Sequence, residues 1–167
     1  RLEKSGWDKP GFDDRNWLGT EVVSRGKANL VSAVSEPVRR MEELSPVKII
    51  YTPGGDTVVD MGQNMVGWCR LTLNCPAGTT IRLRHAEVLD KYGEFYTANL
   101  RSAKCELNYT LAGTGQEVYE PRFTFMGFRY LEVSGFPGTL TPANITGIVV
   151  HSDMKTTGTW ESSNKLL

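Results

Sequence analysis

Polar side chains interrupt an apolar row in the segment 81–87, and their types could bind a ligand. Successive side chains of a strand point to opposite faces, so His85 and Glu87 fall on the same face as Ile81 and Leu83. An imidazole and a carboxylate on one face can hold the polar groups of a ligand by hydrogen bonds. The alternation therefore predicts a histidine and a carboxylate on the inward face of the sheet.

A second apolar row places Arg129 on the face that holds Leu131 and Val133. A charged group on an inward face is costly unless an opposite charge lies beside it. We therefore predict that Glu87 or Asp60 lies near Arg129.

Two interpretations of these polar groups stay open. They could line a ligand pocket on a concave sheet face, where an arginine, a histidine and a carboxylate hold sugar hydroxyls. They could instead form a mutually satisfied network at a sheet end or at a contact with another domain. The residues of this candidate polar cluster are Asp60, Gln63, Asn64, His85, Glu87 and Arg129.

Other chemistries have little support in the sequence. Two histidines leave little scope for a metal site or a nucleophilic triad, and three cysteines without Cys-x-x-Cys spacing predict free thiols. No pair of carboxylates stands out as the acid and base of glycoside hydrolysis. We expect no catalytic residue, metal or cofactor in this chain. Four aromatic residues could stack on sugar rings if they are exposed: Trp68, Tyr92, Tyr96 and Trp160.

Short β-branched segments separated by Gly and Pro recur along the chain and predict strands. This spacing, with almost no helical periodicity, favours an all-β antiparallel sandwich of the jelly-roll or concanavalin-like kind. Residues 37–44 could form a short helix or an extended linker, and a turn is expected at Met61 and Gly62. The predicted strands are Val47–Thr52, Thr57–Val59, Val66–Leu73, Thr79–Leu89, Glu106–Leu111, Val118–Val133 with breaks at Pro121 and Gly127, and Ile145–His151.

Charge and hydropathy exclude two classes of partner. The 167 residues carry 19 Lys and Arg against 19 Asp and Glu, for a formal net charge of zero. No global field is available to attract nucleic acid or a membrane surface, and no apolar run is long enough to span a bilayer. The chain starts at Arg1 rather than Met, so we expect a piece of a longer polypeptide whose localisation stays open.

Four stretches of the sequence stand out as motifs: Asp60–Gly67 (DMGQNMVG), Leu83–Leu89 (LRHAEVL), Tyr96–Ala103 (YTANLRSA) and Glu120–Tyr130 (EPRFTFMGFRY). In these motifs and in their order along the chain, the sequence resembles the bacterial α-L-rhamnosidases. The resemblance implies the concanavalin-like β-sandwich domain that precedes the catalytic α/α barrel in that family.

The resemblance also implies a division of the chain into three parts. Residues 1–45 would be the end of a preceding jelly-roll module with a linker, 46–153 the β-sandwich, and 154–167 the lead-in to the barrel. The general acid and base of the family's inverting mechanism lie in the barrel, so we expect this fragment to be inactive alone. Its expected role is to brace the barrel, with the other domains of the polypeptide as partners. The alternative is a carbohydrate-binding module that recognises rhamnosylated glycans.

Overall fold

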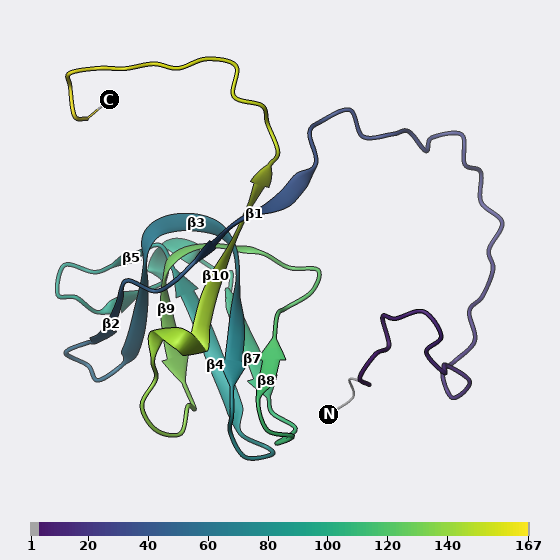
Figure 1. Ribbon diagram of the computed structural model, residues 1–167, viewed down its shortest axis with the longest axis horizontal. Coiled ribbons are helices and arrows are strands. Elements are labelled where there is room, and N and C mark those ends of the chain that lie inside the picture. The colour runs from purple at the N-terminus through teal and green to yellow at the C-terminus, as the bar shows by residue number, and fades with distance from the viewer. Residues whose placement is uncertain (1–3, 167) are drawn as a thin grey trace. The chain divides into compact units, whose positions relative to one another are not determined.

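The computed structural model describes residues 4–166, which fold as two compact units divided between Ser35 and Glu36. In the first unit, residues 4–35 form turns and extended chain. There Phe12 packs edge-to-face on Trp17 with 5.4 Å between the ring centroids, and Arg15 pairs with Asp13. All the strands belong to the second unit (Figure 1).

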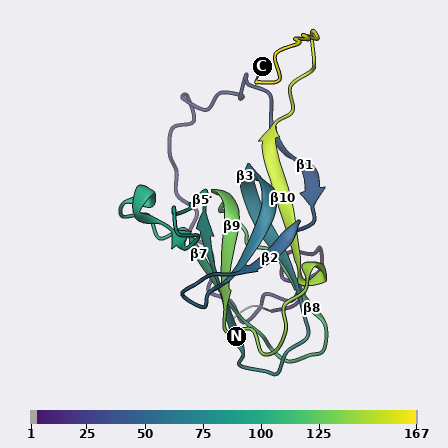
Figure 2. The same cartoon turned by 90° about the vertical axis from the view of Figure 1, so that its left-hand side faces the viewer.

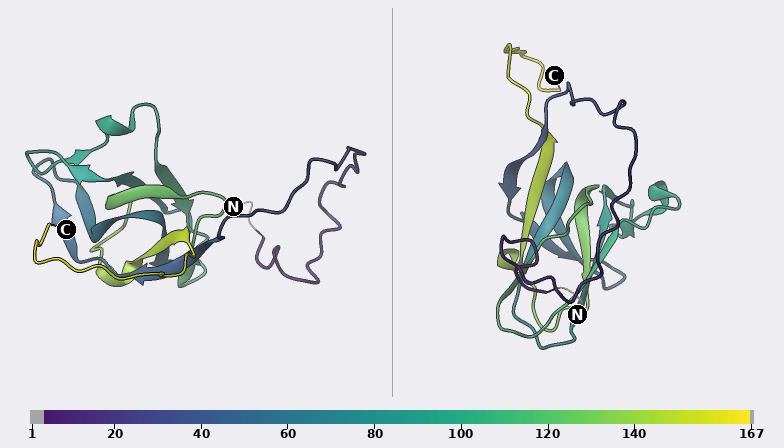
Figure 3. Two further views of the ribbon diagram at one scale, coloured as in Figure 1. Left: turned by 90° about the horizontal axis from the view of Figure 1, so that it is seen from above. Right: turned by 90° about the vertical axis from the view of Figure 1, so that its right-hand side faces the viewer.

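An antiparallel sheet of eight strands forms the second unit, in the order β1-β10-β3-β9-β4-β7 with β2 and β8 also paired to β3. Figures 2 and 3 show these strands side by side in a curled sheet. A separate hairpin pairs β5 with β6. The sheet strands are β1 (Val38–Leu44), β2 (Lys48–Tyr51), β3 (Thr57–Leu73), β4 (Thr80–Ala86), β7 (Glu106–Thr110), β8 (Glu117–Tyr119), β9 (Met126–Ser134) and β10 (Ile145–Ser152); the hairpin is β5 (Val88–Leu89) and β6 (Phe95–Tyr96).

The long strand β3 organises the sheet because it pairs with four others. Its first residues lie between β2 and β9, its middle pairs with β10, and its last residues pair with β8. The strand predicted over 66–73 lies within β3, where Cys69, Leu71 and Leu73 are buried. The same face continues into β4, β9 and β10, so one apolar core holds the strands together.

The all-β class predicted from the sequence is confirmed, but two local expectations are wrong. The turn expected at residues 61–62 is instead an irregularity inside β3, between Asp60 and Met65, where Gly62 has a φ of +85°. Residues 38–44 are neither a helix nor an unpaired linker, because they form β1 and pair with β10. The compact unit accordingly begins at Glu36, upstream of the expected domain start at residue 46.

The two helical segments are single 3₁₀ turns, η1 (Ala98–Leu100) and η2 (Pro142–Asn144). Within residues 4–166, no helix is long and apolar enough to cross a membrane.

Candidate functional site

Arg129 forms a two-pronged ion pair with Asp60 at the irregularity of β3. Its Nε donates to Asp60 Oδ1 and its Nη2 to Oδ2, each at 2.9 Å, and the Gly62 backbone N–H donates to Oδ1 at 2.7 Å. The hydrogen bonds from Arg129 hold the pKa of the Asp60 carboxyl below its ordinary value, against the opposing effect of burial. The predicted proximity of Asp60 to Arg129 is confirmed.

The predicted direction of the Arg129 side chain is wrong, because 39% of that side chain is exposed. Phe128 and Leu131 are both fully buried although they lie an odd number of residues apart. Simple alternation would put them on opposite faces. Between Asp60 and Met65, strand β3 carries extra residues relative to β9, and Arg129 lies opposite this irregularity.

Replacing Asp60 by asparagine is expected to lower the free energy of unfolding by about 1 to 2 kcal/mol, because two charge-assisted hydrogen bonds are weakened at a partly buried site. Asp153→Asn is the matched control, since the pair of Asp153 with Arg39 is exposed and close to neutral in energy. Urea unfolding of both variants checks this. Equal losses in the two variants would show that the Asp60 pair is not structural.

Glu87 lies on the bend between β4 and β5 and binds two amides rather than an arginine. Its Oε1 accepts from Asn64 Nδ2 and its Oε2 from Asn99 Nδ2, both at 3.3 Å. Gln63 is exposed and has no side-chain hydrogen bond within residues 4–166. The structure therefore joins Asn64 to Glu87 and Asp60 to Arg129 as separate pairs.

His85 is fully buried and stands apart from both pairs. Its Nδ1 lies 2.8 Å from the Cys105 carbonyl oxygen, and its ring packs edge-to-face on Phe128 at 4.9 Å. The carbonyl can only accept, so Nδ1 carries the proton, while Nε2 has no hydrogen-bond partner among the described residues. Burial lowers the pKa of His85 to about 4, against the weaker opposing effect of that hydrogen bond.

A larger charged network, missed in the sequence, crosses from β1 to β3. Arg70 donates to both oxygens of Glu43, at 2.7 and 2.9 Å, and to Glu120 at 2.7 Å. Trp68 Nε1 donates to Glu120 at 2.9 Å, and Arg40 lies 3.3 Å from the same carboxylate. The paired carboxylates hold the pKa of Arg70 above its ordinary value. The network joins three segments distant in sequence.

The aromatic residues singled out for sugar stacking lie at three places, because Tyr92 and Tyr96 belong to the same β5–β6 hairpin. Trp68 is half-buried within the charged network. Tyr92 is 69% exposed at the turn between β5 and β6, and Tyr96 is also exposed. Trp160 is exposed beyond β10. The four do not share a common surface element.

The segment 120–125 projects from the sheet as an aromatic loop. Tyr119, before the loop, pairs with Leu71 of β3, and Met126, after it, pairs with Gly67. The six residues of the loop therefore lie opposite only three residues of β3, 68–70. Phe123 has a φ of +61° and is 99% exposed, and Phe125 is 68% exposed. The break expected at Pro121 is confirmed, because Pro121 lies in this loop. The break expected at Gly127 is wrong, because Gly127 lies inside β9.

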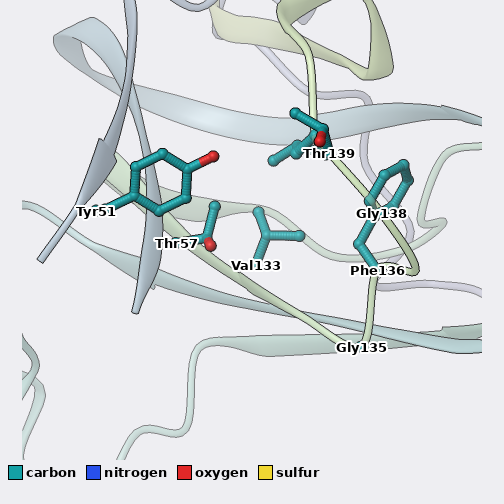
Figure 4. A pocket seen from close by; sticks show the side chains of 8 residues that line it. Tyr51, Thr57, Val133, Gly135, Phe136, Gly138 and Thr139 are labelled. Carbon is teal, nitrogen blue, oxygen red and sulfur yellow. The ribbon is translucent and has the colours of Figure 1, made fainter. Parts of the chain in front are cut away.

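Two cavities open on the sandwich, and neither is lined by a member of the candidate polar cluster. One of about 240 Å³ is shown in Figure 4. The second, of about 340 Å³, lies beside the segment 97–106. Within residues 4–166 no three His, Cys, Asp or Glu side chains are grouped so as to hold a metal ion. The first cavity is lined by Tyr51, Thr57, Val133, Gly135, Phe136, Gly138, Thr139 and Leu140; the second by Arg82, Arg84, Thr97, Arg101, Ala103, Lys104 and Glu106.

Comparison with known proteins gives one consistent result. The family model of the bacterial α-L-rhamnosidase concanavalin-like domain matches residues 50–151. An α-L-rhamnosidase of Streptomyces avermitilis is 49% identical over all of this chain, which covers 16% of that protein. One from Formosa agariphila is 35% identical over 99% of this chain, which covers 18% of it.

Solved structures agree with these relatives. The crystal structure of native α-L-rhamnosidase from Aspergillus terreus superposes with a TM-score of 0.90 at 45% identity, covering 99% of this chain and 19% of that one. The Streptomyces avermitilis enzyme complexed with L-rhamnose gives 0.79 at 52% identity, covering 90% of this chain and 15% of that one. The chain thus spans less than a fifth of these relatives.

Proposed function

Because the chain belongs to the bacterial α-L-rhamnosidase family, we propose that it is a non-catalytic β-sandwich domain that braces the catalytic part of such an enzyme. The parent enzyme hydrolyses terminal α-L-rhamnosides with inversion of configuration. Its general acid and base come from an α/α barrel outside these residues.

The aromatic loop is the observation that carries this proposal. A phenylalanine ring buries a large apolar area when it is covered, and exposed aromatic groups on a projecting loop mark contact surfaces. Phe123 also holds a left-handed backbone conformation that is rare for a bulky residue and unfavourable by about 1 kcal/mol or more. The loop exposes two phenylalanine rings, and one of them has a strained backbone. Such a loop is suited to contact with another protein surface rather than to exposure to solvent.

The remainder of the parent polypeptide is the partner we propose for this loop. The chain accounts for only 16 to 18% of the curated relatives to which it aligns along its length. An apolar pocket on the catalytic part would receive Phe123 and Phe125. The ends of the loop are fixed, because Glu120 is held by Trp68 and Arg70, and Met126 pairs with Gly67.

The state of the carboxylates supports a non-catalytic role. An inverting glycosidase needs one carboxylic acid that stays protonated, which requires a raised pKa. Here the hydrogen bonds from Arg129 lower the pKa of Asp60. At Glu120 burial is the largest single influence and raises the pKa, but the bonds from Trp68 and Arg70 together with the charges of Arg40 and Arg70 outweigh it, so the pKa is lowered. Glu132 is paired with Arg84 at 2.6 Å. The lowered pKa values suit Asp60 and Glu120 to ion pairs and not to proton donation.

Replacing Phe123 by glycine is expected to act in opposite directions on the isolated chain and on the full-length enzyme. The isolated chain gains up to about 1 kcal/mol of stability, because glycine adopts the left-handed conformation without strain. The full-length enzyme loses about 2 kcal/mol of domain contact and inactivates faster on heating. Thermal unfolding of the chain and thermal inactivation of the enzyme measure the two effects.

Tyr92→Gly is the matched control, because Tyr92 is an exposed aromatic residue on the turn of another hairpin. It is expected to leave the inactivation rate of the full-length enzyme unchanged. If Phe123→Gly also leaves that rate unchanged, the loop does not contact the catalytic part and the proposed bracing role loses its support.

A further inference from the structure

A small uncharged cavity lies between the β2–β3 hairpin and the chain that follows β9. Tyr51 and Thr57 are cross-strand partners at the end of that hairpin. Val133 comes from β9, and Phe136 and Thr139 come from the connection toward η2. Figure 4 shows the Tyr51 ring at one side, the Phe136 ring at the other, and Thr57, Val133 and Thr139 between them.

Most of the surface that lines the cavity is polar, and three of the lining residues carry hydroxyl groups. Val133 and Leu140 are each 6% exposed and contribute a small apolar floor, whereas Tyr51 is 67% exposed and open to contact. The hydroxyl groups of Tyr51, Thr57 and Thr139 make no side-chain hydrogen bond within residues 4–166 and are available to a ligand. None of the lining residues is an acid, a lysine, an arginine or a histidine.

These properties select one class of ligand. The lack of charge disfavours ions, because a buried ion needs an opposite charge or several strong donors. The volume of about 240 Å³ is below the usual range for drug-sized ligands and suits a single small ring. A ligand ring with one apolar face and several hydroxyl groups could place that face on the aromatic side chain of the cavity and form hydrogen bonds with the free hydroxyl groups.

We propose that this cavity binds one neutral saccharide unit, with an apolar face of the sugar ring on Tyr51 and its hydroxyls on Thr57 and Thr139. The site goes beyond the bracing role, because it uses a different part of the sandwich from the aromatic loop. It is also distinct from the four aromatic residues that the sequence suggested for sugar stacking. The shallow opening and single exposed ring imply weak, millimolar binding.

The test is a titration of the 167-residue chain with L-rhamnose, and in parallel with D-glucose, followed by backbone amide NMR. We expect shifts confined to Tyr51, Thr57 and residues 133–140 with at least one of the two sugars. Tyr51→Ala is expected to weaken binding roughly tenfold, which is the contribution of one aromatic contact. Because Tyr51 is exposed, the Tyr51→Ala variant should fold as the unaltered chain does, and an amide spectrum unchanged outside the cavity verifies this.

Tyr92→Ala is the control, since it removes an equally exposed tyrosine from another hairpin, and it should leave the affinity unchanged. A Thr139→Val variant tests the hydroxyl contact separately and should weaken binding while keeping the side-chain shape. The proposal is overturned if neither sugar shifts these amides at high millimolar concentration. It is also overturned if Tyr51→Ala binds as tightly as the unaltered chain, or if the shifts centre on Tyr92, Tyr96 or Trp160. None of these results bears on the aromatic loop.

Discussion

Gly67→Ala should abolish cooperative folding of the β-sandwich. Gly67 lies in β3 where β10 crosses closely, and it pairs with Val149 there. A Cβ atom at this position would lie 1.8 Å from the Ile148 carbonyl oxygen and 2.9 Å from its carbonyl carbon. Both atoms belong to the backbone of a paired strand, so neither can move without separating β3 from β10. We expect a loss of more than about 4 kcal/mol, at the extreme of single substitutions.

Gly127→Ala is the matched control for this prediction. Gly127 lies in the neighbouring strand β9, and its added Cβ would meet only Glu87 Oε1, at an ordinary 3.7 Å. Thermal unfolding monitored by circular dichroism distinguishes the two variants. A Gly67→Ala protein that unfolds cooperatively near the temperature of Gly127→Ala would show that β3 and β10 are not packed as described.

Acid should destabilise the sandwich through His85 before it affects the paired carboxylates. The pKa of His85 is lowered from 6.5 to about 4 in the folded chain, so the unfolded chain binds the extra proton between these values. The contribution of the neutral buried imidazole to the free energy of unfolding is fully present above pH 6.5 and decreases as the pH falls toward 4. The full loss is roughly 3 kcal/mol.

A His85→Asn variant isolates this effect, because asparagine does not titrate and its amide can still donate to the Cys105 carbonyl. The variant is expected to be less stable at neutral pH, since its smaller side chain leaves space beside Phe128. Its free energy of unfolding should nevertheless stay flat between pH 6.5 and 5, where that of the unaltered chain falls. Equal slopes in the two proteins would assign the acid sensitivity to another group.

The sequence predicted the parts of the fold that depend on local alternation. Ile81, Leu83 and His85 share the buried face as expected, because β4 is regular over that length. Alternation failed for Arg129, which lies opposite the irregularity of β3, because a local pattern does not show which strands pair or where their register is broken. The ion pair with Asp60 was still predictable from the cost of an unpaired charge.

Edge strands and long-range networks were harder to predict for a physical reason. Strand β1 has almost no buried side chain, so its sequence lacks the apolar alternation of a strand, and backbone pairing with β10 holds it in place. The network of Arg70, Glu43 and Glu120 depends on that pairing and on β8 lying beside β3. Nothing in the spacing of these three residues indicates that they meet.

We propose that the polar groups of this domain hold it together and that the aromatic loop holds it against the rest of the enzyme. The proposal that the domain itself performs no hydrolysis is tested with the isolated 167-residue chain. A cooperative unfolding transition first verifies that the chain is folded, and turnover of an aryl α-L-rhamnoside is then measured. We expect no release of the aryl group above the buffer rate. Turnover comparable to that of a full-length α-L-rhamnosidase would contradict it.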